Sequence, residues 1–268
     1  MLEQKWSYAG GFTAEKEIRR RRALAAWLRE SLLALGPTFI KIGQLFSARA
    51  DLLPREVTEE LSLLQDGVPS FSAAKAAATV ASELGALPES LFDEFSPEPL
   101  AAASLGQVHF ARLRGSGLPV VVKIQRPGLK ALFEIDLAAL KSIAEALDKG
   151  DEARDFRGIY AETAAILLQE IDYIAEGRNA DRFRRDFASV PWVRVPRVFW
   201  QHTSPRVVTL EYMPGSKISD VDSHRSLGLD PTRLARLSTE SYLIQILKTG
   251  ADRTQPSTRA LHPPAQAL

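Results

Sequence analysis

A single lysine stands in the middle of a strongly apolar segment of this sequence, Pro119 to Gln125. The many β-branched residues of the segment predict a buried strand. An unpaired ammonium is costly to bury, so Lys123 must either emerge on a solvated face or find a charged partner. Small residues precede the segment, from Ala101 to Ser104, and a backbone with small side chains can approach a phosphate closely. The pattern indicates a phosphate site around Lys123, although exposure on an edge strand is the ordinary explanation of such a lysine taken alone.

A lysine that positions phosphates needs a carboxylate partner on a nearby helix. Glu170, Asp172 and Glu176 lie close together in a stretch with helical periodicity. Each of the three is a candidate partner of Lys123. On one continuous helix Glu170 and Asp172 would point about 200° apart and could not both face one partner. The alternative for all three is an ordinary solvated acidic helix face.

A second group of polar residues lies near the N-terminus. Lys41 and Gln44 are three residues apart and would share one face of a helix. Gly43 between them costs a helix about 1 kcal/mol relative to alanine, so it predicts close packing against another element. A helix–helix contact with an incidental polar pair is the alternative.

A strand that ends in a Pro-Gly break follows later, from Val207 to Gly215. Such a strand fits a hinge between two lobes, and its backbone could hydrogen-bond an adenine edge. A β-edge followed by an ordinary turn is an equally simple explanation of the same residues.

Periodicity and punctuation predict the elements that must hold these residues. The predicted helices cover residues 14–35, 39–51 with Pro37 in the first turn, 55–64, 72–84 with Ser72 as the cap, 129–147, 156–187 as one or two helices, and 232–247. The predicted strands cover the second half of residues 100–113 and residues 119–125, 193–200 and 206–212, and the first two form a hairpin.

Composition excludes several classes of protein. The 268 residues are 45% hydrophobic and 25% charged, which argues against wholesale disorder. A net charge of +1 argues against a protein that coats nucleic acid. The sequence has no cysteine and four scattered histidines, which excludes thiolate chemistry and makes a metal site unexpected. No stretch has the length or apolarity of a targeting or transmembrane segment, so none is expected in this chain.

Four motifs occur in one order along the chain: Leu35 to Leu45, Ala101 to His109, Val120 to Gly128, and Glu170 to Tyr173 with Asn179. Over about residues 14 to 250 they resemble the UbiB/ADCK-type atypical kinases, the AarF-domain proteins. The resemblance implies an α+β fold: a protein-kinase-like N-lobe with an N-terminal helical extension and an incomplete helical C-lobe. The implied domains are an extension at 1–95, an N-lobe with a helical insert at 96–213, the start of a C-lobe at 214–250 and an irregular tail at 251–268.

The same resemblance assigns roles to residues. Lys123 matches the nucleotide-positioning lysine, and Glu176 is its preferred partner, with Glu170 as the other candidate. The helix with Lys41 and Gln44 would fold across the active site to meet the Glu170-x-Asp172 element. The expected cofactor-binding residues are Lys123, Ala101, Ala102, Ala103, Ser104, Val108, Glu176, Glu211 and Met213, and the further family motif comprises Lys41, Gln44, Glu170 and Asp172.

The implied ligands are ATP or ADP, with Mg²⁺ in the full-length family, and the implied activity is ATP-dependent phosphotransfer or ATP hydrolysis in quinone and isoprenoid-lipid metabolism of a plastid or mitochondrion. Family members continue into a His-Ala-Asp catalytic loop and an Asp-Phe-Gly element, but here Gly250 is followed by Ala251-Asp252 and a proline-rich tail. Asp252 is therefore the one candidate remnant of a catalytic residue, and the chain is expected to be truncated or frame-altered, without metal ligands and inactive as given.

Two other functions remain open. One is a non-catalytic nucleotide- or lipid-binding regulatory pseudokinase, and the other is a peripheral membrane protein whose basic helix, Arg19 to Arg29, rests on anionic lipid. The expected partners are thus a nucleotide and a membrane surface or isoprenoid lipid, with no nucleic acid. A solvated helix face is the commoner meaning of such an arginine run.

Overall fold

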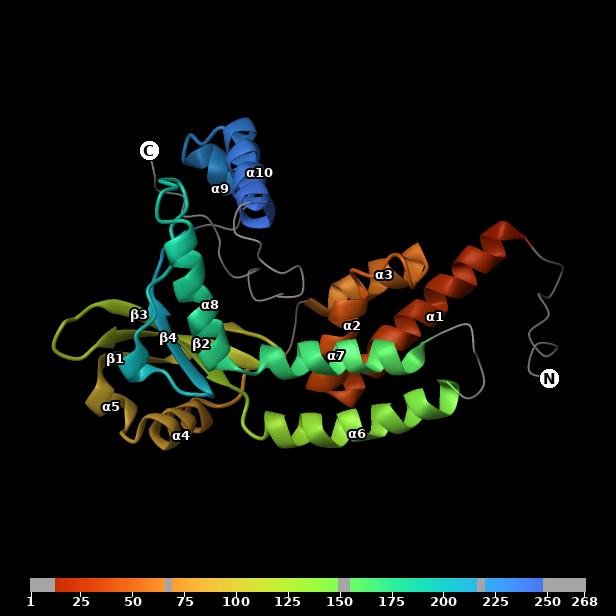
Figure 1. Ribbon diagram of the computed structural model, residues 1–268, viewed down its shortest axis with the longest axis horizontal. Helices are drawn as coiled ribbons and strands as arrows, with labels where there is room; N and C mark the ends of the chain where they lie inside the picture. The colour runs from red at the N-terminus through yellow and green to blue at the C-terminus, as the bar shows by residue number, and fades with distance from the viewer. Residues whose placement is uncertain (1–12, 66–68, 149–154, 216–219, 248–268) are drawn as a thin grey trace. The chain divides into compact units, whose positions relative to one another are not determined.

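The computed structural model describes residues 13–65, 69–148, 155–215 and 220–247 (Figure 1). The chain divides into two compact units that alternate along the sequence. Of the described residues, the helical unit comprises 13–65, 69, 103–105, 128–148 and 155–167, and the sheet unit comprises 70–102, 106–127, 168–215 and 220–247. Helices and an antiparallel sheet together give the α+β class that the sequence predicts.

The helical unit is formed by α1 (Ala14–Leu35), α2 (Pro37–Phe46), α3 (Arg55–Ser62), a 3-10 turn η2 (Leu63–Gln65), α6 (Leu129–Asp148) and most of α7 (Phe156–Glu170). Gly36, with φ of 100°, breaks the chain between α1 and α2, and Pro37 opens the second helix as predicted. A Cβ at Gly43 would collide with Leu64 and lie 2.9 Å from Leu32. The close helix packing predicted from Gly43 is therefore confirmed.

The sheet unit contains β1 (Phe92–Ala102), β2 (Gly106–Leu113), β3 (Pro119–Gln125) and β4 (Val207–Glu211), in the antiparallel order β1-β2-β3-β4. Its helical elements are α4 (Ala73–Leu84), α5 (Pro88–Leu91), α8 (Tyr173–Asp186), η3 (Trp200–His202), α9 (Val221–Ser226) and α10 (Pro231–Leu247). The predicted β2–β3 hairpin is confirmed, and Ser72 caps α4 as expected by accepting a hydrogen bond from the Lys75 amide.

The sheet has two unlike faces because successive side chains of a strand point to opposite sides. On one face, Val120, Val122 and Ile124 are fully buried in a core that includes Ala76 and Val80 of α4, and we call this the α4 face. On the other face Val108, Val121 and Lys123 are only half-buried. We call this side the α8 face, because Tyr173 of α8 packs there with Val208.

Two predicted elements differ from the structure, and one strand of the structure is not among the predicted elements. Residues 193–200 do not form a strand; among them the described residues show only an isolated bridge from Val198 to Leu210. The helix expected to reach residue 51 ends at Phe46. β1, an edge strand that contains Pro97 and Pro99, was not predicted, because proline usually argues against a strand and is tolerated at a sheet edge, where no donor is needed.

The predicted irregular tail and Asp252 lie outside the described residues. No helix in the described part of the chain has both the length and the apolarity to cross a bilayer. The domain boundaries implied by the resemblance stay predictions, and the two compact units group α4 and α5 with the sheet.

Candidate functional site

The central feature of the α8 face is an ion pair between β3 and α8. Nζ of Lys123 lies 2.6 and 2.8 Å from the two carboxylate oxygens of Glu176, and both side chains are largely shielded from solvent, with exposed fractions of 32% and 19%. Nζ also lies 4.6 Å from the centre of the Tyr173 ring. The expected partner Glu176 is therefore in contact with Lys123, and the charge of Glu170, the other candidate, also raises the pKa of the lysine, with a smaller effect.

The charges of this group are set by burial and by one another. Burial alone lowers the pKa of Lys123, but the neighbouring Tyr173 and the carboxylate of Glu176 outweigh it, so the pKa of the lysine lies above its ordinary value. Burial raises the pKa of Tyr173 to about 12, so the phenol stays protonated at neutral pH. Its hydroxyl is buried and makes no hydrogen bond with the described residues.

The position of Glu176 follows from where α8 begins. The side chain of Asp172 accepts a hydrogen bond from the Ala175 amide at 2.9 Å and caps the helix, which places Glu176 in its first turn. Glu170 is the last residue of α7, so Glu170 and Asp172 do not share a helix. Glu170 and Asp172 would be unable to face one partner only if they lay on one continuous helix, so that expectation does not apply. Residues 156–187 form two helices, which is one of the two expected layouts.

Trp200 fixes α8 from its other side. A Cβ at Gly177, next to Glu176, would lie 2.8 Å from the Trp200 ring, so η3 and α8 are in close contact. The indole Nε1 donates to Asp181 of the same helix at 2.7 Å. Glycine at 177 therefore allows the approach that holds Glu176 in place.

Strand pairing puts the predicted residues in a row across the α8 face. Ala101 of β1 stands opposite Val108 of β2, Val108 opposite Lys123 of β3, and Lys123 opposite Val208 of β4. Neighbouring strands are about 4.8 Å apart, so Ala101 lies about 10 Å from the Lys123 backbone. Half-buried valines beside a charged lysine form an apolar surface with one cation at its centre.

The remaining predicted residues lie outside this row. Glu211, at the end of β4, accepts hydrogen bonds from Arg194 at 2.8 Å and from the Arg197 amide at 3.2 Å. Met213 follows it and is half-buried. Ala103 and Ser104 belong to the helical unit, and their place over the phosphates stays a prediction.

The Lys-x-Gly-Gln motif lies in the helical unit, on α2. Gln44 donates from Nε2 to the carbonyl of Leu64 at 2.8 Å and so ties α2 to η2. It stays a prediction that Lys41 and Gln44 meet Glu170 and Asp172.

The donor set suits a phosphate better than a metal ion. Lys123 provides a cation and Tyr173 a phenol, and Glu176 provides the carboxylate that is hydrogen-bonded to Lys123. No group of three or more His, Cys, Asp or Glu able to hold a metal occurs in the described ranges. The Mg²⁺ implied by the resemblance therefore finds no ligand set in this part of the chain.

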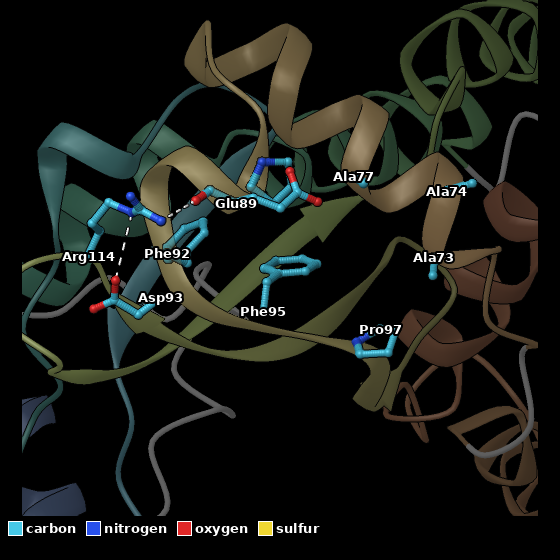
Figure 2. Close-up of a pocket in the computed structure, with 10 residues that line it drawn as sticks. Ala73, Ala74, Ala77, Glu89, Phe92, Asp93, Phe95, Pro97 and Arg114 are labelled. Carbon is cyan, nitrogen blue, oxygen red and sulfur yellow. Dashed lines mark hydrogen bonds and ion pairs between the residues drawn. The ribbon is translucent and has the colours of Figure 1, made fainter.

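A separate hollow of about 400 Å³ lies on the α4 face, away from Lys123 (Figure 2). Arg114 at its rim donates to the carbonyl of Glu89 at 2.8 Å and lies 3.7 Å from Asp93. Its lining consists of Ala73, Ala74, Ala77, Pro88, Glu89, Phe92, Asp93, Phe95, Pro97 and Arg114. None of the predicted site residues lines it.

Sequence reasoning missed two residues of the α8 face, Val121 and Tyr173. Val121 stands two positions before Lys123, so the period of two in a strand could have placed it on the same face. Tyr173 closes the Glu170 to Tyr173 motif, but its contact with Lys123 could not be predicted from spacing, because the contact joins elements that are distant in sequence.

Comparison with known proteins finds matches over most of the chain. A family model, the ABC1 atypical kinase-like domain, matches residues 63–258. A chloroplastic protein of Arabidopsis thaliana named Activity of bc1 complex kinase 7 is 56% identical over 94% of this chain and 36% of its own length, and kinase 8 of that name is 51% identical over 96% and 34%. An uncharacterized Synechocystis protein is 55% identical over 94% and 44%. The chain thus spans between a third and a half of these relatives.

Among solved structures, the complex of Rv3197 with erythromycin from Mycobacterium tuberculosis superimposes with a TM-score of 0.52 and 28% identity. The superposition covers 68% of this chain and 46% of the other.

Proposed function

The chain belongs to the ABC1 atypical kinase-like family, and from this premise we propose that its sheet unit holds ATP or ADP on the α8 face. The ammonium of Lys123 binds phosphate oxygens, Glu176 orients that ammonium, and Val108 and Val121 offer the half-buried apolar surface for the base. Ala101 and Ala102 border the phosphates, with Ala103 and Ser104 following them in the loop, and Glu211 to Met213 form the hinge.

The observation that carries this proposal is the bidentate pair between Lys123 and Glu176. A lysine ammonium has three N–H donors, and two of them are directed at the carboxylate oxygens. The third remains for a phosphate oxygen, and the raised pKa keeps the group charged over the physiological range. The pair therefore holds a preorganised cation beside an apolar surface, which is what a nucleotide requires.

For the whole protein we propose ATP-dependent phosphotransfer or ATP hydrolysis in quinone or isoprenoid-lipid metabolism, in a plastid as the names of two relatives suggest. Mg²⁺, when bound with the nucleotide, would neutralise phosphate charge. No Asp-Phe-Gly triplet occurs in the 268 residues, so we propose that the chain as given binds nucleotide without turning it over. A regulatory, non-catalytic pseudokinase is the alternative for the same site.

Nucleotide affinity of the 268-residue chain tests the proposal. Lys123→Ala is expected to raise the Kd for ATP by about tenfold or more, because a hydrogen bond to a charged group contributes about 1.5–3 kcal/mol. Isothermal titration with ATP and with ADP, each with and without Mg²⁺, measures the change.

Lys141→Ala is the matched control, because this lysine is exposed on α6 in the helical unit. It should leave the affinity unchanged. Equal affinity in Lys123→Ala and the unaltered chain would refute the proposed site, and ATP turnover that depends on metal and on Lys123 would refute the non-catalytic part.

A second candidate function, membrane association, is favoured by the outer surface of α1. Leu24 and Trp27 are 61% and 62% exposed, and the basic run Arg19 to Arg22 precedes them on the same helix. A large apolar side chain beside several arginines is typical of a helix that lies on an anionic bilayer.

Replacing Arg19 and Arg22 by glutamine should weaken binding to vesicles containing phosphatidylglycerol by about thirtyfold, because each basic residue near such a surface contributes about 1 kcal/mol. Vesicle flotation at low and high salt measures the loss. Arg233→Gln with Arg236→Gln on α10 serves as the control of equal charge. Unchanged flotation in the Arg19/Arg22 variant would exclude this surface.

A further inference from the structure

Two buried polar side chains of β2 form a hydrogen-bonded chain on the α4 face, opposite the row that contains Lys123. Gln107 and His109 are 1% and 0% exposed. Oε1 of Gln107 accepts from the Phe71 amide at 3.0 Å, its Nε2 lies 2.8 Å from Nε2 of His109, and Nδ1 of His109 lies 2.8 Å from the carbonyl oxygen of Ser96. These hydrogen bonds thus join the segment before α4, strand β2 and strand β1.

The two backbone groups at the ends of this series of hydrogen bonds determine which atoms between them donate and which accept. The Phe71 amide can only donate and the Ser96 carbonyl can only accept, so Gln107 turns its amide nitrogen toward His109 and His109 carries its proton on Nδ1. A second proton on His109 would set two donors against each other. Burial lowers the pKa of His109, against the opposing effects of the Ser96 carbonyl and Glu98, which agrees with a neutral ring.

The contact with Ser96 falls where β1 departs from regular pairing. From Phe95 to Pro99 strand β1 advances four residues, whereas its partner advances two, from Ala111 to His109. Ser96 lies within this irregular stretch, and Phe95 at its start stacks on the His109 ring with the centres 5.1 Å apart. Phe95 is also part of the hollow on the α4 face (Figure 2).

The irregular stretch and a second register shift, between Pro99 and Ala101, together decide which residue of β1 reaches the nucleotide face. After the second shift, Ala101 pairs with Val108 and Ala102 with Gln107. A slip of one residue would turn Ala101 to the other side of the sheet, because side chains alternate between the faces. By its hydrogen bond to the Ser96 carbonyl, His109 fixes how many residues of β1 lie within the bulge.

We propose that Gln107 and His109 are positioning residues of the nucleotide site: their hydrogen-bonded chain fixes the β1 bulge and keeps Ala101 and Val108 in line with Lys123. This inference rests on the proposed function and adds to it a pair of residues that never touch the nucleotide.

The test compares two substitutions of His109 in the 268-residue chain. His109→Leu removes both hydrogen bonds and should raise the Kd for ATP by about tenfold, since small displacements in a binding site have large effects. His109→Asn places an amide N–H where Nδ1 was, keeps the bond to Ser96, and should stay within about threefold of the unaltered chain. The amide NMR signals of Ala101 and Val108 should shift in His109→Leu and return toward their original positions in His109→Asn.

Val80→Ala is the control for stability, because Val80 lies in the core between α4 and the sheet and its apolar side chain forms no hydrogen bond to the bulge. It should lower the unfolding temperature without changing the Kd or the Ala101 signal. The positioning role is overturned if His109→Leu binds ATP like the unaltered chain, or if Val80→Ala weakens binding as much as His109→Leu does. If Lys123→Ala loses binding and His109→Leu does not, the positioning role alone fails; if the unaltered chain binds no ATP, the proposed function fails and the positioning role with it.

Discussion

Replacing Gly106 by alanine is expected to lower the free energy of unfolding by about 3 kcal/mol, at the upper end of the cost of overpacking a core. A Cβ at this position would lie 2.5 Å from the carbonyl oxygen of Ile124 and 2.8 Å from the Tyr173 hydroxyl. The first of these atoms belongs to the paired backbone of β3 and cannot move without breaking the hairpin. Urea unfolding followed by circular dichroism measures the change.

Two companion variants separate the two close contacts. Gly106→Ala combined with Tyr173→Phe removes the hydroxyl and should recover part of the loss, with the remainder due to Ile124. Gly215→Ala is the matched control, because a Cβ there would meet nothing within 4 Å, and it should change stability by less than about 0.5 kcal/mol. A Gly106→Ala variant as stable as the unaltered chain would contradict the close approach of α8 and β3 to this residue.

Local patterns predicted the elements of this chain well where the determinants are local. α1 begins at Ala14 and ends at Leu35 as its periodicity indicates, and Ser72 begins α4 by accepting a hydrogen bond from its third residue. The β2–β3 hairpin follows from two apolar runs separated by a Gly-Ser-Gly turn. In each case the signal and the structure lie within a few residues of each other.

Elements that depend on distant partners could not be predicted in the same way. β1 reads as irregular because of Pro97 and Pro99, and its bulge is bonded to His109 from the neighbouring strand. Residues 193–200 have the composition of a strand but gain only one bridge to β4, so composition alone misled there. Tertiary pairing decided both segments.

The residues of the candidate site also differ in whether their determinants are local. Lys123 could be singled out because an ammonium inside an apolar strand demands a partner, and Glu176 was found with the help of the family resemblance. Residue spacing could not predict the buried hydroxyl of Tyr173 or the hydrogen-bonded pair of Gln107 and His109. Their contacts reach other strands or a helix far along the chain.

Removing Glu176 alone is expected to cost more stability than removing both members of the ion pair. Glu176→Gln leaves the ammonium of Lys123 shielded from solvent without its anion, and we expect a loss of about 2 kcal/mol, below the 3–5 kcal/mol of a fully buried pair because the lysine is partly exposed. Lys123→Met added to Glu176→Gln removes the stranded charge and should restore about 1 kcal/mol or more. Urea unfolding of both single variants and the double variant at neutral pH gives the coupling energy.

The pH dependence provides an independent check on this cycle. The pKa of Lys123 is raised in the folded chain above the ordinary value of 10.5, so the pair contributes its full stability below that value and loses it as the pH rises through the folded pKa. The difference in stability between the unaltered chain and Glu176→Gln should therefore be constant around neutrality and shrink only in strong alkali. A difference that vanishes at neutral pH, or a double variant less stable than Glu176→Gln, would show that the pair does not hold α8 to β3. Because the double variant has no cation for a phosphate, its recovered stability should come without recovered ATP affinity, which separates the structural role of the pair from its role in binding.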